Sequence, residues 1–259
     1  MTGQKKNIGT AVLLEHKSLK EEIFDVLHKR IISGKYSPGE WLRQEDISTQ
    51  LGVSQTPVRE ALDLLVSSGL TERIPYRGVR VLQLTAEEIV DSYVLRLLLE
   101  STAVAVSARN RTDEQLKTLY NMVEKTETLS TLNDMSVQMQ LNREFHHAIV
   151  AAGGNSLMTK LYETVSHQFP DWMLYEYMFR FPQLLKPTLT KEFQEHKAII
   201  DAISAQNPEQ AATNVITHIK HLGDELVTFL GIPQILLTEK EKQMLIPQNT
   251  WGNNSNPAT

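Results

Sequence analysis

The chain has 259 residues, of which 41% are hydrophobic and 22% charged, with a net charge of −5 and no cysteine. This length allows two domains with separate cores, and the missing cysteine excludes a disulfide framework, a thiolate zinc site and a cysteine nucleophile. No apolar run reaches the length of a membrane span, and residues 1–17 lack the apolar core of a signal peptide. We therefore expect a cytoplasmic protein with no membrane contact.

The charges are unevenly distributed along the chain. Residues 1–84 carry 12 Lys and Arg against 10 Asp and Glu, a balance of +2, whereas the remaining residues carry 14 against 21, a balance of −7. Such an asymmetry favours an N-terminal part that faces nucleic acid and a C-terminal part that does not.

Three helices are predicted in the first seventy residues. Apolar residues at helical spacing indicate a helix over about 18–33. A second helix over 44–51 ends at Gly52, which supplies the left-handed conformation of a sharp exit. Ser54 then caps a third helix, and Pro57 sits in its first turn, where its missing N–H has no helical partner. Two short helices that meet at a glycine indicate a helix-turn-helix.

The third helix exposes polar side chains at its start. Gln55, Thr56 and Arg59 fall on the face opposite its apolar residues. Gln can bond adenine in the major groove, and Arg can bond guanine or hold a phosphate. An ordinary capped surface helix would explain the cap and the apolar face equally well.

The segment after this helix favours the DNA-binding interpretation. Residues 71–74 and 79–82 resemble two strands, joined by a turn at 75–78 that contains Pro75 and Gly78. A hairpin that carries Arg73, Arg77 and Arg80 is typical of the wing of a winged helix.

The N-terminal motifs as a set are similar to the DNA-binding domain of GntR-family bacterial transcription regulators. They are Ser33–Glu40, Leu51–Ser54, Thr56–Leu62, Gly69–Leu70 and Arg77–Gly78. The resemblance implies that DNA contacts come from Arg43, Ser54, Gln55, Thr56, Arg59, Arg77 and Gly78. Family members commonly carry Arg in place of Gln55 and often in place of Glu45, so the operator sequence cannot be transferred from relatives.

The remainder of the chain is predicted to be an all-α antiparallel bundle. Helices are expected near 85–109, 113–131, 134–152, 155–180, 187–206 and 208–230. The fold class is therefore mainly α, with a winged helix-turn-helix followed by a helical bundle. The expected organisation is a flexible arm at 1–17, a DNA-binding domain at 18–84, a helical domain at 85–230 and a largely disordered tail at 231–259.

Three of these helices place a polar side chain on the face that should be buried. Asn142 and His146 share one such face, and His196 and His218 interrupt the apolar faces of two others. Buried polar groups need partners, and three imidazoles with an amide could obtain them by binding a divalent metal ion. Each histidine alone is more simply a structural core residue.

The motifs around these residues resemble the FCD ligand domain found in the FadR branch of GntR regulators. They are Arg96–Glu100, Asn142–His146, Gly154–Asn155, Glu195–His196 and His218. The resemblance implies a divalent metal such as Zn, Ni or Mn, held by Asn142, His146, His196 and His218, and a small organic acid as effector. Asp is usual where this chain has Asn142, which removes one negative charge and favours an anionic effector.

Arg96 and Tyr93 are the candidates for binding the far end of that acid. The competing interpretation of Arg96 is a helix salt bridge with Glu100, four residues on.

We therefore expect a regulator, acting as a repressor, that binds double-stranded operator DNA as a homodimer and responds to a carboxylate effector. One alternative is a winged-helix regulator with structural histidines and no metal. Another is a metal-dependent hydrolase, which needs a general base; Glu144 is nearest, but its position on the helix points it away from Asn142 and His146.

Overall fold

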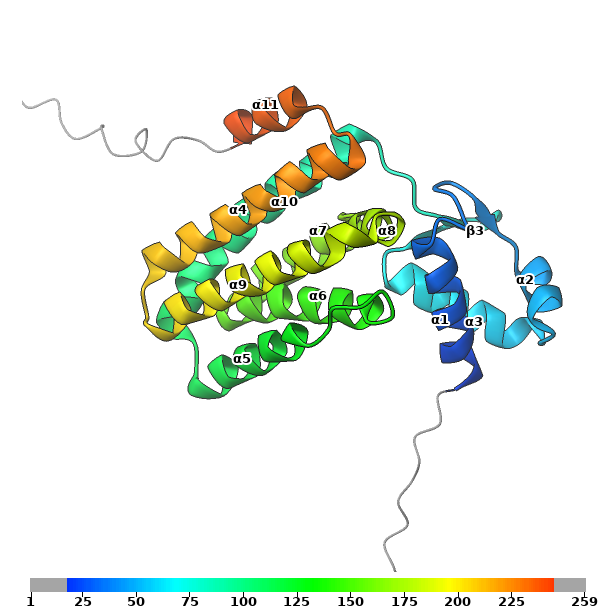
Figure 1. Cartoon of the computed structure of the whole chain (residues 1–259), viewed down its shortest axis with the longest axis horizontal. Helices are drawn as coiled ribbons and strands as arrows, with labels where there is room; N and C mark the ends of the chain where they lie inside the picture. Colours follow the sequence, from blue (N-terminus) through cyan, green and yellow to red (C-terminus); the bar gives the residue numbers. More distant parts are fainter. Residues whose placement is uncertain (1–17, 245–259) are drawn as a thin grey trace, which may run out of the picture.

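The structure, a computed structural model, describes residues 18–244 as a small N-terminal domain beside a larger helical bundle (Figure 1). The predicted fold class is confirmed: a winged helix-turn-helix followed by an all-α domain. The expected arm at 1–17 and the last part of the expected tail, 245–259, lie outside the described residues.

The N-terminal domain combines three helices with a small antiparallel sheet in the order β1-β3-β2. Its elements are α1 (Leu19–Ile32), β1 (Trp41–Leu42), α2 (Gln44–Leu51), α3 (Gln55–Ser67), β2 (Thr71–Ile74) and β3 (Gly78–Val81). Strands β2 and β3 form the predicted wing, with Thr71 opposite Val81 and Ile74 opposite Gly78. Strand β1 was not predicted, because two residues are too few to show an alternating pattern.

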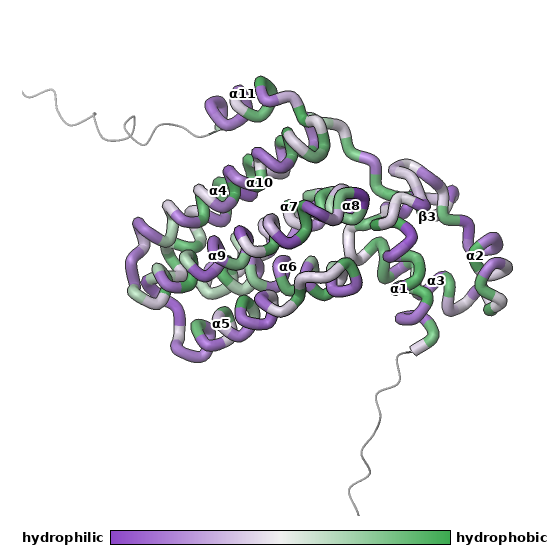
Figure 2. Tube along the Cα trace, in the orientation of Figure 1, coloured by the Kyte–Doolittle hydropathy of each residue, from purple (hydrophilic) through white to green (hydrophobic). Residues whose placement is uncertain are grey.

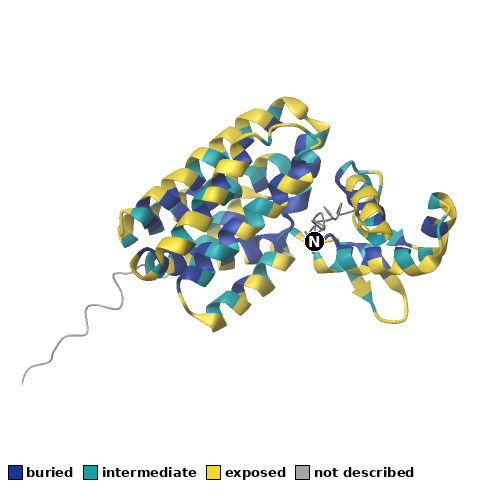
Figure 3. Cartoon of the chain, turned by 90° about the horizontal axis from the view of Figure 1, so that it is seen from below, coloured by how far each residue is buried: buried dark blue, intermediate teal, exposed yellow. Residues whose placement is uncertain are grey.

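The C-terminal domain packs its helices around α4, which contacts α6, α7, α9, α10 and α11. Its elements are α4 (Ala86–Asn110), α5 (Asp113–Glu127), α6 (Met135–Ala152), α7 (Ser156–Gln168), α8 (Asp171–Arg180), η1 (Pro182–Leu184), α9 (Leu185–Ser204), α10 (Pro208–Leu230) and α11 (Gln234–Met244). Thr85 caps α4 in a capping box with Glu88, as its sequence predicts. Hydrophobic and hydrophilic residues alternate along the helices (Figure 2), and buried residues lie where the helices face one another while exposed ones lie on the outside (Figure 3).

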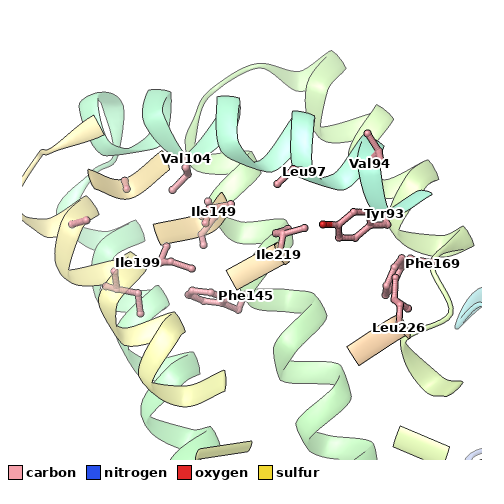
Figure 4. Packing of buried hydrophobic residues seen from close by; sticks show 14 of the residues in the cluster. Tyr93, Val94, Leu97, Val104, Phe145, Ile149, Phe169, Ile199, Ile219 and Leu226 are labelled. Atoms are coloured by element: carbon pink, nitrogen blue, oxygen red, sulfur yellow. The ribbon is translucent and has the colours of Figure 1, made fainter. Parts of the chain in front are cut away.

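The core of the bundle is built from apolar residues of α4, α6, α9 and α10, several of which are fully buried (Figure 4). Leu97 and Val104 of α4 lie near Ile149 of α6 and Ile219 of α10 in this cluster. The polar residues that the sequence places on buried helix faces therefore lie on helices that are held in a close-packed interior.

The expected single helix at 155–180 is wrong, because it is broken into α7 and α8 at Phe169 and Pro170. Proline has no N–H for the helix and forces the preceding residue into an extended conformation. Phe169 accordingly has φ −77° and ψ 126°. The break turns α8 out of line with α7 and gives it the position between the two domains described below.

Helix α11 lies in a segment where no regular structure was expected. Gly231 ends α10 with φ 70°, and Pro233 precedes the new helix. Leu237 is 5% exposed and joins the bundle core. The sequence of α11 carries too few apolar residues for its periodicity to be visible, so only its tertiary contacts identify it.

The two domains share a second core cluster. Residues of α1, α3 and the sheet are joined there by Met135 and Met139 of α6 and by Trp172, Tyr175 and Met178 of α8. Polar contacts reinforce this junction at the C-terminal end of α3. Arg143 donates to the carbonyl oxygen of Ser68, and the carbonyl oxygen of Ser67 lies 3.1 Å from Nε2 of His167.

Candidate metal centre and DNA-binding surface

The start of α3 has the geometry that its sequence predicts. Gly52 ends α2 with φ 67°, and Ser54 occupies the N-cap of α3 with extended backbone angles. Four of the predicted DNA-contacting side chains follow on one exposed surface: Ser54, Gln55, Thr56 and Arg59. The side chain of Gln44 donates to the carbonyl oxygen of Gln55 at 2.8 Å and fixes this helix start against α2.

The remaining predicted DNA contacts lie near the same surface. Arg43, Arg59, Arg77 and Gly78 line an open hollow between α3 and the wing with a volume of about 670 Å³. The other two wing arginines are paired, Arg73 with Asp63 and Arg80 with Glu72. Within residues 18–244, Arg43, Arg59 and Arg77 form no ion pair, so their charges are available to phosphates.

Sequence reasoning missed Tyr76 at the tip of the wing. Its side chain is fully exposed and its φ is 63°, an uncommon value for a non-glycine residue. The turn residues Pro75 and Gly78 signalled a turn here, but they did not distinguish an exposed aromatic side chain from a packed one.

Three histidines from three helices converge inside the bundle. His146 of α6, His196 of α9 and His218 of α10 are 2%, 2% and 7% exposed. Nε2 of His218 lies 3.3 Å from Nε2 of His146 and 3.4 Å from Nε2 of His196. One nitrogen from each ring lies within 4.8 Å of the others, a spacing that suits a shared metal ion.

Two carboxylates fix how these imidazoles present their nitrogens. Glu100 lies 2.6 Å from Nδ1 of His146, and Glu195 lies 2.7 Å from Nδ1 of His218. A carboxylate accepts a hydrogen bond, so Nδ1 carries the proton and Nε2 presents a lone pair to the centre. Burial lowers the pKa of His146 and of His196, which favours neutral rings. The Nε2 lone pairs of His146 and His218, 3.3 Å apart, repel one another unless a cation or a proton lies between them.

Asn142 lies one helical turn before His146. Its Oδ1 is buried and has no hydrogen-bond partner within residues 18–244. Asn142 also lines, with His146 and His218, a cavity of about 50 Å³ that adjoins the histidines. An orphaned buried acceptor beside three imidazoles fits a fourth ligand, so the donor set suits a divalent ion.

Arg96 takes part in a buried ion pair. Its Nε donates to Glu100 at 2.7 Å, and its guanidinium lies 4.8 Å from the centre of the Phe169 ring. Burial alone would raise the pKa of Glu100, but Arg96 and His146 lower it to about 2. Glu100 thus links Arg96 to His146. This link was not predicted, because Glu100 and His146 are 46 residues apart.

Tyr93, the other candidate for the effector, does not line this cavity. Its ring packs closely on Gly223 of α10, and its hydroxyl donates to Glu241 of α11 at 2.6 Å. The sequence did not predict α11 as its partner. Glu195 was also missed as a positioning residue, although it contacts both His218 and His221.

Comparison with known proteins decides the family. Residues 19–81 match the family described as bacterial regulatory proteins, gntR family, and residues 91–221 match the FCD domain. The chain belongs to the GntR family of transcriptional regulators. It is therefore a DNA-binding regulator and not an enzyme, which removes the hydrolase alternative. Glu144, the base which that alternative required, is exposed and accepts from Gln140.

Several GntR-family relatives match along most of their length. The regulator YdhC of Bacillus subtilis is 27% identical over 205 residues, which are 77% of this chain and 87% of the relative. The repressor NanR of Klebsiella aerogenes is 26% identical, over 81% of this chain and 86% of the relative.

Solved structures share the fold. McbR/YncC of E. coli has a TM-score of 0.58 at 23% identity, covering 82% of this chain and 99% of that one. A GntR regulator from Rhodococcus sp. RHA1 has a TM-score of 0.56 at 23% identity, covering 83% and 99%. Within residues 18–244, no helix of this GntR-family chain is long and apolar enough to cross a membrane.

Proposed function

We propose that this protein is a dimeric repressor whose affinity for operator DNA changes when a small organic acid binds beside a divalent metal ion in the helical domain. The observation that carries the proposal is the convergence of three imidazole Nε2 atoms, two of whose rings are oriented by carboxylates. Repression is supported by NanR, a relative named as a repressor.

The metal ion would be held by Asn142, His146, His196 and His218, and Zn, Ni and Mn are the candidates. When bound, it would supply positive charge and an open coordination position suited to a carboxylate. The side chains around the ion would orient its ligands. Glu100 and Glu195 hold two of the imidazoles in the required tautomer, and Arg96 keeps Glu100 ionised.

Helix α8 connects the metal site to the DNA-binding domain. Leu174, Tyr175 and Met178 line the cavity beside the histidines, and Asp171 at the start of the same helix binds Arg143 through both carboxylate oxygens, at 2.6 and 2.7 Å. Arg143 in turn binds the end of α3. Effector binding that shifts α8 would thus move the recognition helix, which carries Gln55, Thr56 and Arg59 at its other end.

A homodimer is proposed because one short recognition helix reads few bases, and two-fold symmetric half-sites double the contact. Light scattering during gel filtration, which measures the mass in solution, tests this directly. A mass of one 29.4 kDa chain would refute the dimer.

The metal site is tested by elemental analysis of the purified full-length protein after dialysis against Zn²⁺, Ni²⁺ or Mn²⁺. We expect near one ion per chain in the wild type and a large loss in His196→Ala. His147→Ala is the matched control, since His147 is an exposed histidine of α6. No metal in the wild type would leave the alternative of a winged-helix regulator with structural histidines.

Regulation is tested with a DNA duplex selected from a random library by the full-length protein. Anisotropy titrations with metal-loaded protein, with and without each of a panel of C2 to C6 organic acids, give the change in operator affinity. An acid that changes the affinity of the wild type but not of His196→Ala supports the proposal.

A further inference from the structure

The cavity beside the histidines is lined by more carboxyl groups than basic side chains, and the basic ones are Arg96 and Lys191. Its lining includes Asp171 of α8, Glu192 and Glu195 of α9, and Glu225 of α10. The neutral Asn142 led us to expect a site that favours anions, but these four carboxyl groups face the same small space. An anion with a second negative group would meet them at its far end.

Two of the four carboxyl groups have partners. Asp171 is paired with Arg143. Glu195 accepts from His218 and His221 and lies 3.9 Å from Nζ of Lys191. Glu192 and Glu225 form no hydrogen bond or ion pair with any residue of 18–244, and Oε1 of Glu192 is fully buried.

A third group in the same lining also lacks a partner. Tyr175 is 4% exposed, and its buried hydroxyl lies near the side chain of Asn142 but forms no hydrogen bond of normal geometry within the described part of the chain. Buried polar groups are almost always paired, so an unpaired hydroxyl beside unpaired carboxyl groups indicates a missing partner. Burial raises the pKa of Glu192 to about 8 and that of Glu225 to about 7, and the charges of Arg96 and Lys191 offset this rise only in part.

We propose that the effector carries an ammonium group that is held by Glu192 and Glu225, with the hydroxyl of Tyr175 beside them, in addition to its carboxylate. This inference rests on the proposed function, because the carboxylate end is assigned to the metal centre. The effector is then a zwitterion, with its carboxylate assigned to the metal ion and its ammonium group to these two carboxyl groups. The net charge of the occupied site would also be balanced. The zwitterion is neutral overall, and the two carboxylates would offset the charge of a divalent ion.

The size of the cavity limits the length of the effector. Its volume of about 50 Å³ has room for only a few water molecules at roughly 10–15 Å³ each. A compact amino acid fits this space better than a longer or branched acid. Amino acids with the amine at the chain end are the informative probes, because a single ion cannot readily chelate both of their ends.

The test uses isothermal titration calorimetry on the full-length, metal-loaded protein at pH 7. The probes are β-alanine, γ-aminobutyrate and 5-aminovalerate, each compared with propionate, butyrate or valerate, and with malonate, succinate or glutarate. We expect at least one amino acid to bind about tenfold or more tightly than its des-amino partner, and the dicarboxylates to bind most weakly.

The variants Glu225→Gln and Glu192→Gln/Glu225→Gln identify the residues responsible. Both are expected to lose most of the preference for the amino acid, while binding of the plain carboxylate and the metal content stay unchanged. Glu163→Gln, an exposed glutamate of α7, is the matched control. Unchanged metal content and circular dichroism exclude misfolding as the cause of the loss.

Three results would overturn the inference while leaving the metal site intact: equal or tighter binding of the des-amino or dicarboxylic acids, a preference that survives in the double variant, or no binding of either series to metal-loaded protein. Failure of the proposed function is seen separately. In that case the elemental analysis finds no metal in the wild type, and the inference falls with the function on which it rests.

Discussion

The guanidinium of Arg143 donates from Nη1 to the carbonyl oxygen of Ser68 at 2.5 Å, across the boundary between the two domains. Ser68 is the C-cap residue of the recognition helix α3, and Arg143 lies on α6 one residue after Asn142. The same guanidinium binds Asp171 at the start of α8. A single side chain of α6 thus connects α8, which lines the cavity beside the histidines, with the C-terminal end of α3.

Replacement of Arg143 should therefore affect stability and regulation together. Arg143→Met leaves the partly buried Asp171 without its cation, which should lower the free energy of unfolding by about 3 kcal/mol. Urea denaturation measures this loss, with the exposed Arg109→Met as control. The effector should also lose its influence on operator affinity in the anisotropy titration. Unchanged regulation in a folded Arg143→Met protein would refute the proposed route through α8.

Glu100 should act on the metal through His146. Glu100→Gln weakens the hydrogen bond to Nδ1 that orients the imidazole, and loss of such a partner typically costs about 10–100-fold in metal affinity. Competition with a chromophoric chelator gives the dissociation constant. The exposed Glu124→Gln should leave it unchanged. An affinity in Glu100→Gln within about twofold of the wild type would show that His146 needs no such orientation.

His28 should make the protein sensitive to acid. Burial lowers its pKa from 6.5 to about 4, so the folded protein keeps the ring neutral while the unfolded chain takes up a proton below pH 6.5. The stability that depends on this difference is present above pH 6.5 and is lost as the pH falls toward 4, with about 2 kcal/mol gone at pH 5.

The variant His28→Gln isolates this effect, because it keeps a polar group near Ser136 without a titrating ring. Urea unfolding of chelator-treated protein at pH 7.5 and pH 5 should show a smaller difference between the two pH values than in the wild type. His147→Gln should not reduce that difference, because His147 is exposed. An identical pH dependence in the wild type and His28→Gln would contradict the assignment.

Arg77 and Gln55 should contribute to DNA binding in different ways. Arg77, at the wing and free of ion pairs within residues 18–244, is placed to neutralise a phosphate. Arg77→Ala should weaken binding to all sequences and reduce the slope of log K against log salt by about 1. Gln55→Ala should leave the slope unchanged and relax preference at one base pair. If the dependence of DNA affinity on salt is the same in Arg77→Ala as in the wild type, the wing does not contact DNA phosphates.

Local sequence signals account for the parts of the structure that were predicted. Gly52, Ser54 and Pro57 each act on the backbone within a few residues, so the turn and the start of α3 follow from their chemistry. The positions of His146 and His196 on buried faces follow from the spacing of apolar residues on single helices.

The contacts that complete the site depend on tertiary structure and could not be predicted. Glu100 meets His146 across 46 residues, and Tyr93 meets Glu241 across 148. Glu192 and Glu225 have an ordinary helical spacing in their own segments, and only the packing of α9 on α10 brings them to one cavity. The break at Pro170, by contrast, is a local signal that the sequence interpretation overlooked.

The short helix α8 belongs to two cores at once. Leu174 packs in the interior of the bundle, whereas Trp172 and Met178 pack with α1, α3 and the sheet. Loss of either core would remove contacts that hold this helix, so the two domains should melt in a single cooperative transition. A fragment cut at the end of the wing would leave the apolar surface beneath Trp172 open to water, and the DNA-binding domain should therefore not be excised as an independent folding unit.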